Sequence, residues 1–351
     1  MDFSIAAILA QDGITSGAVY ALLALALVLV FSVTRVIFIP QGEFVAFGAL
    51  TLAAMQSDRF PHTATLSVAL GLLCFAQEAI DIARGSTPGS GAARGIGMVA
   101  LKFVLAPLAL WLLTRSLAHP GLPVLLQVLL TLAIVIPLGP MVYRLAFQPL
   151  AQASSLVLLI VAVGVHFALV GLGLLMFGAE GSRTTPLLET RLDLGSVTVS
   201  GQSMAIIFAS LLLIVALYLY FERTLSGKAL RATAVNRLGA QLVGIGTTEA
   251  GRLAFSVAAA MGALSGILIA PLTTVYYDSG FLFGLKGFVG AIIGGLGSYP
   301  IAAGGALLVG LLESYSSFWA SAFKEVIVFT LIIPVLLWRS LRSAHPDEGD
   351  E

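Results

Sequence analysis

The residues best suited to chemistry in this chain are a few ionisable side chains that stand within or beside long apolar runs. They are Glu43, Lys286, Glu313 and the adjacent pair Lys324 and Glu325. A charge in apolar surroundings is costly, so each of them is a candidate for a functional role.

The positions of these charges favour different interpretations. Glu43 follows the segment IPQG, where it can cap a helix whose dipole favours its charge. Glu313, in VGLLESYSS, lies deeper in its run. A polar contact between helices and a place on a transport pathway explain Glu313 equally well. Lys324 and Glu325 stand at the start of the last run, and we expect them at the membrane interface.

Motifs for catalysis are missing from the sequence. No segment reads GxxxxGK[ST], HExxH, GxSxG or CxxC, and the four histidines are scattered. Glu78 and Asp81 lie one turn apart, and we expect them on a solvated interfacial face. The single cysteine, Cys74, is expected to pack in the interior. We therefore predict neither an enzyme nor a cofactor.

Composition identifies the setting of these residues. Of the 351 residues, 58% are hydrophobic and 10% are charged, whereas a soluble domain has about 25% charged residues. The formal net charge is zero without a basic patch, which argues against nucleic-acid binding. The apolar runs are continuous rather than alternating, so helices are favoured over barrel strands. The sequence predicts one all-α domain, residues 1–351, embedded in the lipid bilayer.

About eleven segments are candidates to enter the membrane, since a crossing helix needs about 20 apolar residues. Two of them, 41–56 and 284–297, are short and contain glycine, so we expect them to be tilted, broken or re-entrant. The segments are 13–33, 41–56, 64–83, 97–117, 122–143, 154–177, 204–222, 252–275, 284–297, 300–318 and 325–341.

Basic residues in the connecting loops predict the orientation, because cytoplasmic loops carry an excess of Lys and Arg. With eleven segments, the richer side collects Arg35, Arg84, Arg94, Arg144, the cluster in 223–252, Arg339 and Arg342. The other side holds Arg59, Arg183, Arg191 and Lys286. We assign the richer side to the cytoplasm, which places the C-terminus inside and the N-terminus outside.

Three segments outside the runs have their own character. Residues 178–203 are expected outside, with a small strand pair in DLGSVTVSG. Residues 84–96 form a linker rich in Gly and Ser. Residues 343–351 form a short acidic tail that we expect to be disordered.

Residues 227–252 break the apolar pattern while keeping apolar residues at roughly helical spacing among basic ones. This pattern predicts a short amphipathic helix at the cytoplasmic membrane face that is presented to a partner. The residues expected to make that contact are Lys228, Arg231, Ala234, Asn236, Gly239, Ala240, Gly244 and Ile245.

Glycines concentrate in residues 284–314, where small residues let helices approach closely. The segment GGLGSYP there predicts a break between two helices. Close packing and a translocation role are equally good explanations. Taking 41–56 with 284–314, we place a translocation pathway at Gly42, Glu43, Gly294, Gly295, Gly297, Ser298 and Glu313.

Four segments, in order along the chain, resemble the permease subunits of branched-chain amino acid ABC importers, the LivH-like group. They are IPQGEFVAFGAL, VYRLAFQPLAQASSLVLLIVAVGV, ERTLSGKALRATAVNRLGAQLVGI and GGLGSYPIAAGGALLVGLLES. Gly42 and Glu43 match the group's HGE-type signature, while Gln41 replaces its usual His. Residues 57–121 depart from the group as a two-span insertion where a short connection is usual.

The resemblance implies a permease without its own nucleotide site. It implies cytoplasmic ABC ATPase subunits that dock on residues 223–252, a second permease subunit and a periplasmic substrate-binding protein. The implied location is the bacterial inner membrane, and the implied cargo is a branched-chain or related amino acid.

Two alternatives stay open. An importer of urea or short amides shares the same signatures. A stand-alone secondary transporter would need midplane carboxylates and inverted repeats. The sequence does not name the ligand.

Overall fold

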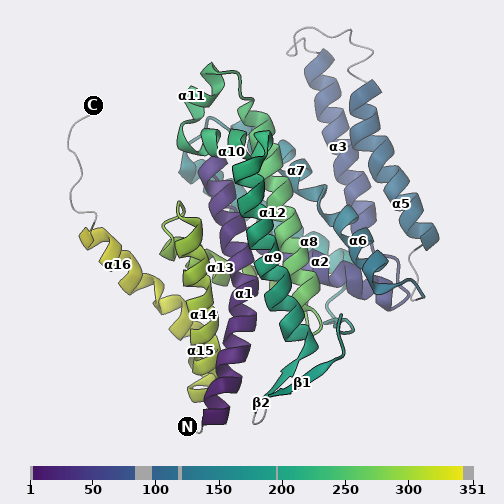
Figure 1. The fold of residues 1–351 in the computed structure, drawn as a ribbon. Coiled ribbons are helices and arrows are strands. Elements are labelled where there is room, and N and C mark those ends of the chain that lie inside the picture. The colour runs from purple at the N-terminus through teal and green to yellow at the C-terminus, as the bar shows by residue number, and fades with distance from the viewer. Residues whose placement is uncertain (1–2, 84–96, 118–120, 195–196, 343–351) are drawn as a thin grey trace.

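The computed structural model describes residues 3–83, 97–117, 121–194 and 197–342, most of them helical (Figure 1). Short π-helical turns (η1, η2) and 3-10 turns (η3, η4) interrupt or extend the α-helices. In chain order the elements are α1 (Phe3–Thr34), α2 (Gln41–Gln56), α3 (Thr63–Ala83), η1 (Leu101–Leu105), α5 (Ala106–Leu117), α6 (Val124–Val135), α7 (Leu138–Val142), η2 (Tyr143–Phe147), η3 (Gln148–Leu150), α8 (Ser155–Phe177), β1 (Arg191–Leu194), β2 (Val197–Ser200), α9 (Gly201–Arg223), α10 (Leu225–Val235), α11 (Arg237–Leu242), α12 (Thr247–Ile269), α13 (Ser279–Ile293), α14 (Tyr299–Trp319), η4 (Ser321–Phe323), α15 (Lys324–Thr330) and α16 (Ile332–Arg342).

Nine helical segments in the described residues are long and apolar enough to cross a bilayer, which confirms the predicted polytopic helical class. The other two expected segments form α2 and α13, of 16 and 15 residues. At 1.5 Å per residue, α2 is about 24 Å long, less than the roughly 30 Å of a hydrocarbon core. Almost all of α2 is buried, so protein rather than lipid surrounds it.

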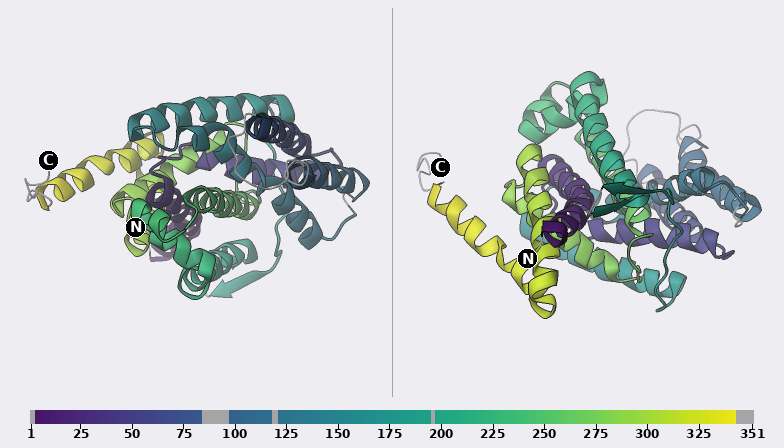
Figure 2. Two further views of the ribbon diagram at one scale, coloured as in Figure 1. Left: turned by 90° about the horizontal axis from the view of Figure 1, so that it is seen from above. Right: turned by 60° about the horizontal axis from the view of Figure 1, so that its bottom comes forward.

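Helix α1 is the axis of the bundle. Its residues from Ala18 to Val30 are all buried, and it contacts α9, α12, α13 and α14. Views along and across the molecule show these helices around it (Figure 2). A helix that is apolar on every side, as α1 is, needs such a position.

The two ends of the bundle carry different structures (Figure 1). Strands β1 and β2 pair antiparallel at the end where α1 begins, which confirms the strand pair expected in 178–203. Helices α10 and α11 lie at the opposite end. The segments assigned to opposite sides of the membrane therefore lie at opposite ends of the bundle.

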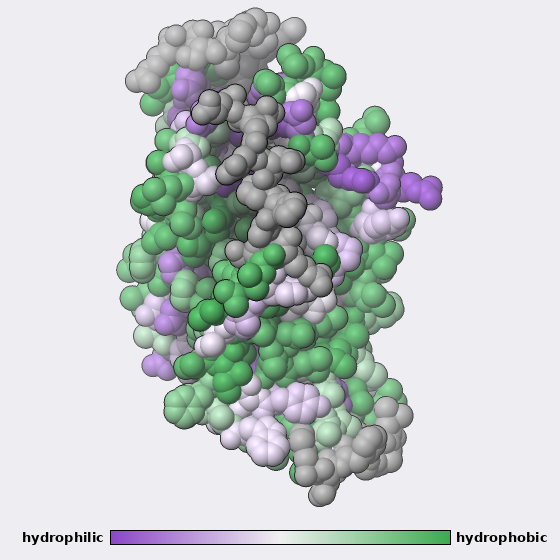
Figure 3. Space-filling model, turned by 90° about the vertical axis from the view of Figure 1, so that its left-hand side faces the viewer, coloured by the Kyte–Doolittle hydropathy of each residue, from purple (hydrophilic) through white to green (hydrophobic). Residues whose placement is uncertain are grey.

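The last expected span, 325–341, is not one continuous helix. Helix α15 ends at Thr330 and α16 begins at Ile332. Pro334 explains the break, because its ring clashes with the carbonyl four residues earlier, that of Thr330, and it lacks an N–H. Apolar side chains cover much of the face seen in Figure 3, as suits a surface in contact with lipid.

Helices α3 and α5, from the segment 57–121, stand at one edge of the bundle (Figure 1). They pack on each other and both contact α6, while α3 also packs on α7 and η2. The 84–96 linker and the 343–351 tail, for which the sequence made expectations, lie outside the described residues.

Glycines set the distance between α2 and its two neighbours. A Cβ on Gly42 would stand 1.8 Å from the carbonyl oxygen of Gly280 in α13. A Cβ on Gly266 in α12 would stand 2.0 Å from the carbonyl oxygen of Val45. The backbones touch at both places. Because these glycines have no side chains, α2 can pack directly between α12 and α13.

We expect Gly42→Ala and Gly266→Ala to destabilise the protein by about 1–3 kcal/mol, because the new methyl group forces two backbones apart. Gly164→Ala in α8 and Gly304→Ala in α14 are matched controls, since no atom lies within 4 Å of an added Cβ there. Thermal unfolding of the protein in detergent measures the difference. Equal shifts in all four variants would contradict the packing role.

Candidate functional site

The segment 223–252 contains two short helices, α10 and α11, and a turn rather than the single amphipathic helix expected from the sequence. Thr224 caps α10 by accepting a hydrogen bond from the Gly227 N–H at 3.0 Å. Asn236 caps α11 by accepting one from the Gly239 N–H at 2.8 Å. Asn236 has an extended backbone, which ends the first helix and starts the second.

Four apolar side chains of this segment are exposed on the surface, at the end of the molecule that α10 and α11 form. Val235 is 85%, Leu238 67%, Leu242 81% and Val243 75% exposed. We call these four residues the docking patch. Apolar groups this exposed, next to basic side chains, are typical of a surface that meets another protein.

The structure places the eight predicted contact residues in different surroundings. Lys228, Arg231, Asn236 and Gly244 are exposed, whereas Ala240 is buried. Arg231 forms an ion pair with Glu222. Gly244 has a φ of +85°, the left-handed region that favours glycine, so it shapes the turn before α12.

The remaining predicted contacts, Ala234, Gly239 and Ile245, are partly buried. The predicted set contained none of the docking-patch residues. Their signal was present in the sequence as apolar residues flanking Arg237 and Gly244, but helical spacing alone did not separate exposed from buried positions.

The underside of the segment is fixed to the bundle. Leu230 packs with Leu29 and Val33 of α1 and with Ala250 and Ala254 of α12 in one buried cluster. Helix α10 is therefore packed directly against both α1 and α12.

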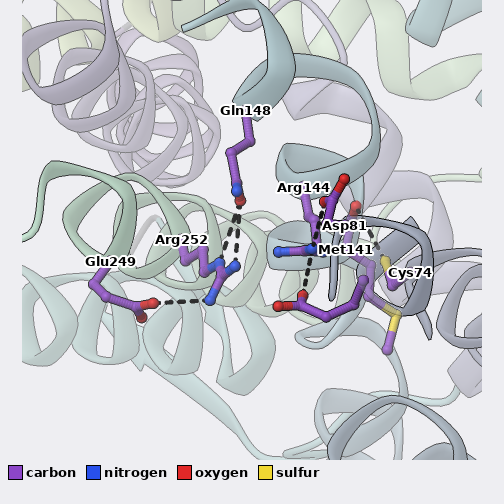
Figure 4. A network of polar contacts seen from close by, with 8 residues as sticks. Cys74, Asp81, Met141, Arg144, Gln148, Glu249 and Arg252 are labelled. Atoms are coloured by element: carbon purple, nitrogen blue, oxygen red, sulfur yellow. Dashed lines mark hydrogen bonds and ion pairs between the residues drawn. The ribbon is translucent and has the colours of Figure 1, made fainter. Parts of the chain in front are cut away.

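A polar network ties the same region to the residues that follow α7 (Figure 4). Arg252 donates to the side-chain oxygen of Gln148 at 3.4 Å and to Glu249 at 2.8 Å. Arg237 donates to the carbonyl oxygen of Ala151 at 3.1 Å. Helices α11 and α12 thus share partners in residues 148–151.

The same stretch holds a buried cation, Arg144. Its side chain is 4% exposed and forms ion pairs with Glu78 and, at 3.7 Å, with Asp81, both on α3 (Figure 4). Its guanidinium also lies 5.9 Å from the ring centre of Phe103 in η1. All these partners come from the segment 57–121. The expectation of a solvated face is wrong for Glu78, which is mostly buried because it neutralises Arg144. Cys74 nearby is buried, as expected.

Glu43 is fully buried in the first turn of α2. The Nδ1 atom of His166 in α8 lies 3.0 Å from its carboxylate, and the His166 ring packs against Phe281. Gln41 donates to the carbonyl oxygen of Ala258 at 2.9 Å. The sequence gave no signal for the Glu43–His166 pair, because 123 residues separate the two.

The predicted pathway residues do not form one cluster. Gly42 lies in the packed contact with α13, and Glu43 lies beside it. Gly294, Gly295, Gly297 and Ser298 form the predicted break between α13 and α14. Gly297 lines a cavity of about 270 Å³ next to Ala234 of α10.

Glu313 instead lines a cavity of about 710 Å³, together with residues of the β2 strand and the first half of α1. There it accepts a hydrogen bond from the Tyr20 hydroxyl at 2.6 Å and forms an ion pair with Lys286 at 2.5 Å. The described residues contain no group of three or more His, Cys, Asp or Glu side chains placed to hold a metal ion.

Comparison with known proteins places these features in a family. Residues 9–336 match the family described as branched-chain amino acid transport system / permease component. The chain is 32% identical over 206 residues to LivH, a high-affinity branched-chain amino acid transport system permease protein of Escherichia coli, covering 57% of this chain and 67% of the relative. It is 26% identical over 341 residues to the corresponding protein BraD of Pseudomonas aeruginosa, covering 93% and 92%. No solved structure matches the chain.

Removing either member of the Arg144–Glu78 pair should leave an uncompensated charge in a buried place. We expect Arg144→Met and Glu78→Gln each to lower the unfolding free energy by up to about 3 kcal/mol. The double variant should lose at least about 1 kcal/mol less than the sum of the two, because the side chains are coupled.

Thermal unfolding in detergent gives the three values. Asp81→Asn is the matched control, since this carboxylate is 44% exposed and lies 3.7 Å from Arg144, so its loss should be smaller. Strictly additive effects of Arg144→Met and Glu78→Gln would show that the contact does not stabilise the protein.

Proposed function

The chain belongs to the branched-chain amino acid transport system permease family, and from this premise we propose that it is the membrane-spanning subunit of an ATP-driven importer. The importer carries branched-chain or related small amino acids. Its other parts are separate cytoplasmic ATPase subunits, a second permease subunit and a periplasmic binding protein.

The observation that carries this proposal is the docking patch. The chain has no nucleotide-binding motif, so an ATPase must act on it from outside. Apolar anchors with basic residues beside them fit a helix-in-groove contact with such a partner. Lys228 and Arg231 are exposed on the preceding helix and supply the basic rim.

The orientation of the chain in the membrane follows from assigning the docking patch to a cytoplasmic ATPase. The end with α10 and α11 faces the cytoplasm, and the end with the β1–β2 hairpin faces the periplasm. The basic cluster in 223–252 lies on the cytoplasmic side of the inner membrane, in accord with the excess of Lys and Arg in cytoplasmic loops.

We place the translocation route along the hairpin of α13 and α14. Its outer part is the cavity that Glu313 lines, and its inner part is the cavity that Gly297 lines. The part of α13 that lines the outer cavity, 279–286, also touches α2 backbone to backbone at Gly42. A shift of α13 away from α2 during transport opens the translocation route at this contact.

The function is tested by purifying the chain from native membranes and reconstituting the complex. Two results would support the proposal. They are a co-purifying ATPase, and ATP-dependent uptake of L-leucine into proteoliposomes when the binding protein is present. Uptake without any ATPase, driven by an ion gradient, would overturn it in favour of a secondary transporter. ATP-driven uptake of urea or acetamide but not leucine would reassign the cargo.

Leu238→Glu and Leu242→Glu should abolish co-purification of the ATPase and reduce uptake at least about tenfold. The reason is that each change places a charge where the partner's groove excludes water. Leu192→Glu is the matched control, since Leu192 is a 51% exposed leucine on β1 at the opposite end. Because these side chains are already in the open, all three variants should keep the unfolding temperature of the parent protein.

Normal ATPase binding by the Leu238→Glu and Leu242→Glu variants would show that the ATPase docks on another surface. Equal loss in the Leu192→Glu variant would show a general effect of the added charge.

A further inference from the structure

The periplasmic-side cavity has the size and the location of a ligand site. Its volume of about 710 Å³ falls in the range of about 300–1,000 Å³ that is usual for small-molecule pockets. Its walls come from α1, β2, α9, the α12–α13 connection, α13, α14 and α15. The exposed carboxylate of Asp12 is part of the wall, so the cavity reaches the surface.

A charged cluster lies in its wall. Lys286 is 5% exposed and contacts two carboxylates, Glu313 at 2.5 Å and Glu325 at 3.2 Å. The second oxygen of Glu313 accepts the Tyr20 hydroxyl at 2.6 Å. Each oxygen of Glu313 therefore has a donor, and Lys286 has three N–H donors for the two carboxylates that it contacts.

The cluster lacks positive charge and has acceptors to spare. The Oε2 atom of Glu325 and the Oε1 atom of Gln11 are buried and have no hydrogen-bond partner in the described chain. The cavity wall carries three carboxylates, Asp12, Glu313 and Glu325, against two ammonium groups, Lys286 and Lys324. An incoming ammonium group supplies donors for the free oxygens and a positive charge next to the Glu325 carboxylate.

A ligand carboxylate has a place as well, because Lys286 is the buried cation of the cavity and can turn its third donor toward it. Apolar residues complete the wall, and they suit an aliphatic side chain: Ile8, Ile269, Leu272, Leu282 and Phe283. A divalent cation fits poorly, since the Lys286 ammonium already contacts Glu313 and Glu325 and repels a second cation there.

We propose that this cavity is a binding site for a zwitterionic amino acid with an apolar side chain, which the permease itself contacts after the binding protein releases it. Glu325, helped by Gln11, takes the ammonium group, and Lys286 takes the carboxylate. The inference rests on the proposed function and adds a specific recognition site to it.

The test measures equilibrium binding to the complex purified with its ATPase and placed in lipid nanodiscs, without binding protein. The probes are L-leucine, 4-methylpentanoate, which lacks the ammonium group, and 3-methylbutylamine, which lacks the carboxylate. L-leucine should bind at least about tenfold more tightly than either, because each lost charge removes one charge-assisted contact.

Two variants separate the two ends of the ligand. Glu325→Gln should weaken binding of L-leucine and 3-methylbutylamine about tenfold and leave 4-methylpentanoate unchanged. The double variant Lys286→Met/Glu313→Gln removes the buried pair together, and the remaining partner Glu325 keeps contact with water because its side chain is 35% exposed. This variant should weaken L-leucine and 4-methylpentanoate instead. Glu189→Gln, an exposed acid on the same side that does not line the cavity, is the control.

Wild-type affinity for L-leucine in both cavity variants would overturn the assignment, and so would the absence of saturable binding by the parent complex. ATP-driven uptake in the same preparations separates this failure from that of the proposed function. If the parent transports L-leucine and the cavity variants bind and transport it normally, only the proposal of a binding site in the cavity is rejected. If the parent complex transports no amino acid, the proposed function itself fails.

Discussion

A charge inside a helical membrane protein is tolerated only when another part of the protein neutralises it, and this constraint organises the molecule. Arg144 is matched by Glu78 and Asp81, and Lys286 by Glu313 and Glu325, while the carboxylate of Glu43 is matched by a hydrogen-bonding contact with the ring nitrogen of His166. In each case the partners come from different helices. Because an unpaired member in hydrocarbon is costly, each match fixes the relative placement of the elements that carry it.

The three matches differ in what they hold together. The Arg144 group attaches α3, which otherwise stands at the edge of the bundle, to the stretch that also contacts Arg252 and Arg237. The Glu43–His166 pair joins α8 to the buried helix α2. The Lys286 group joins α13 to α14 and α15 and lines a cavity that reaches the surface. In this third group the buried Oε2 atom of Glu325 has no partner among the described residues and its side chain lines a cavity, which is why the ligand site is placed there.

The sequence was sufficient for features that depend on local pattern. Continuous apolar runs located the helices, GGLGSYP marked the break before α14, and the alternation in DLGSVTVSG marked the hairpin. Pairings between distant residues could not be predicted, because no pattern in the sequence around Glu43 or Arg144 indicates His166 or Glu78 as a partner. Exposure within the docking segment also depended on tertiary structure. Leu230 and Leu242 have the same side chain, yet one is buried against α1 and the other is 81% exposed.

Helix α1 connects the two ends at which the proposed work is done. Tyr20 donates to Glu313 in the outer cavity, and Leu29, nine residues further on, packs against Leu230 beneath the docking patch. Nine residues of helix span about 14 Å, and the whole stretch is buried and continuous, without a break between the two contacts. We expect a displacement of α10 by a partner to reach the Tyr20–Glu313 contact through this stretch of helix. Loosening that contact would free an acceptor oxygen of Glu313 next to Lys286, which would link the position of the docking segment to the polar groups that a ligand meets in the cavity.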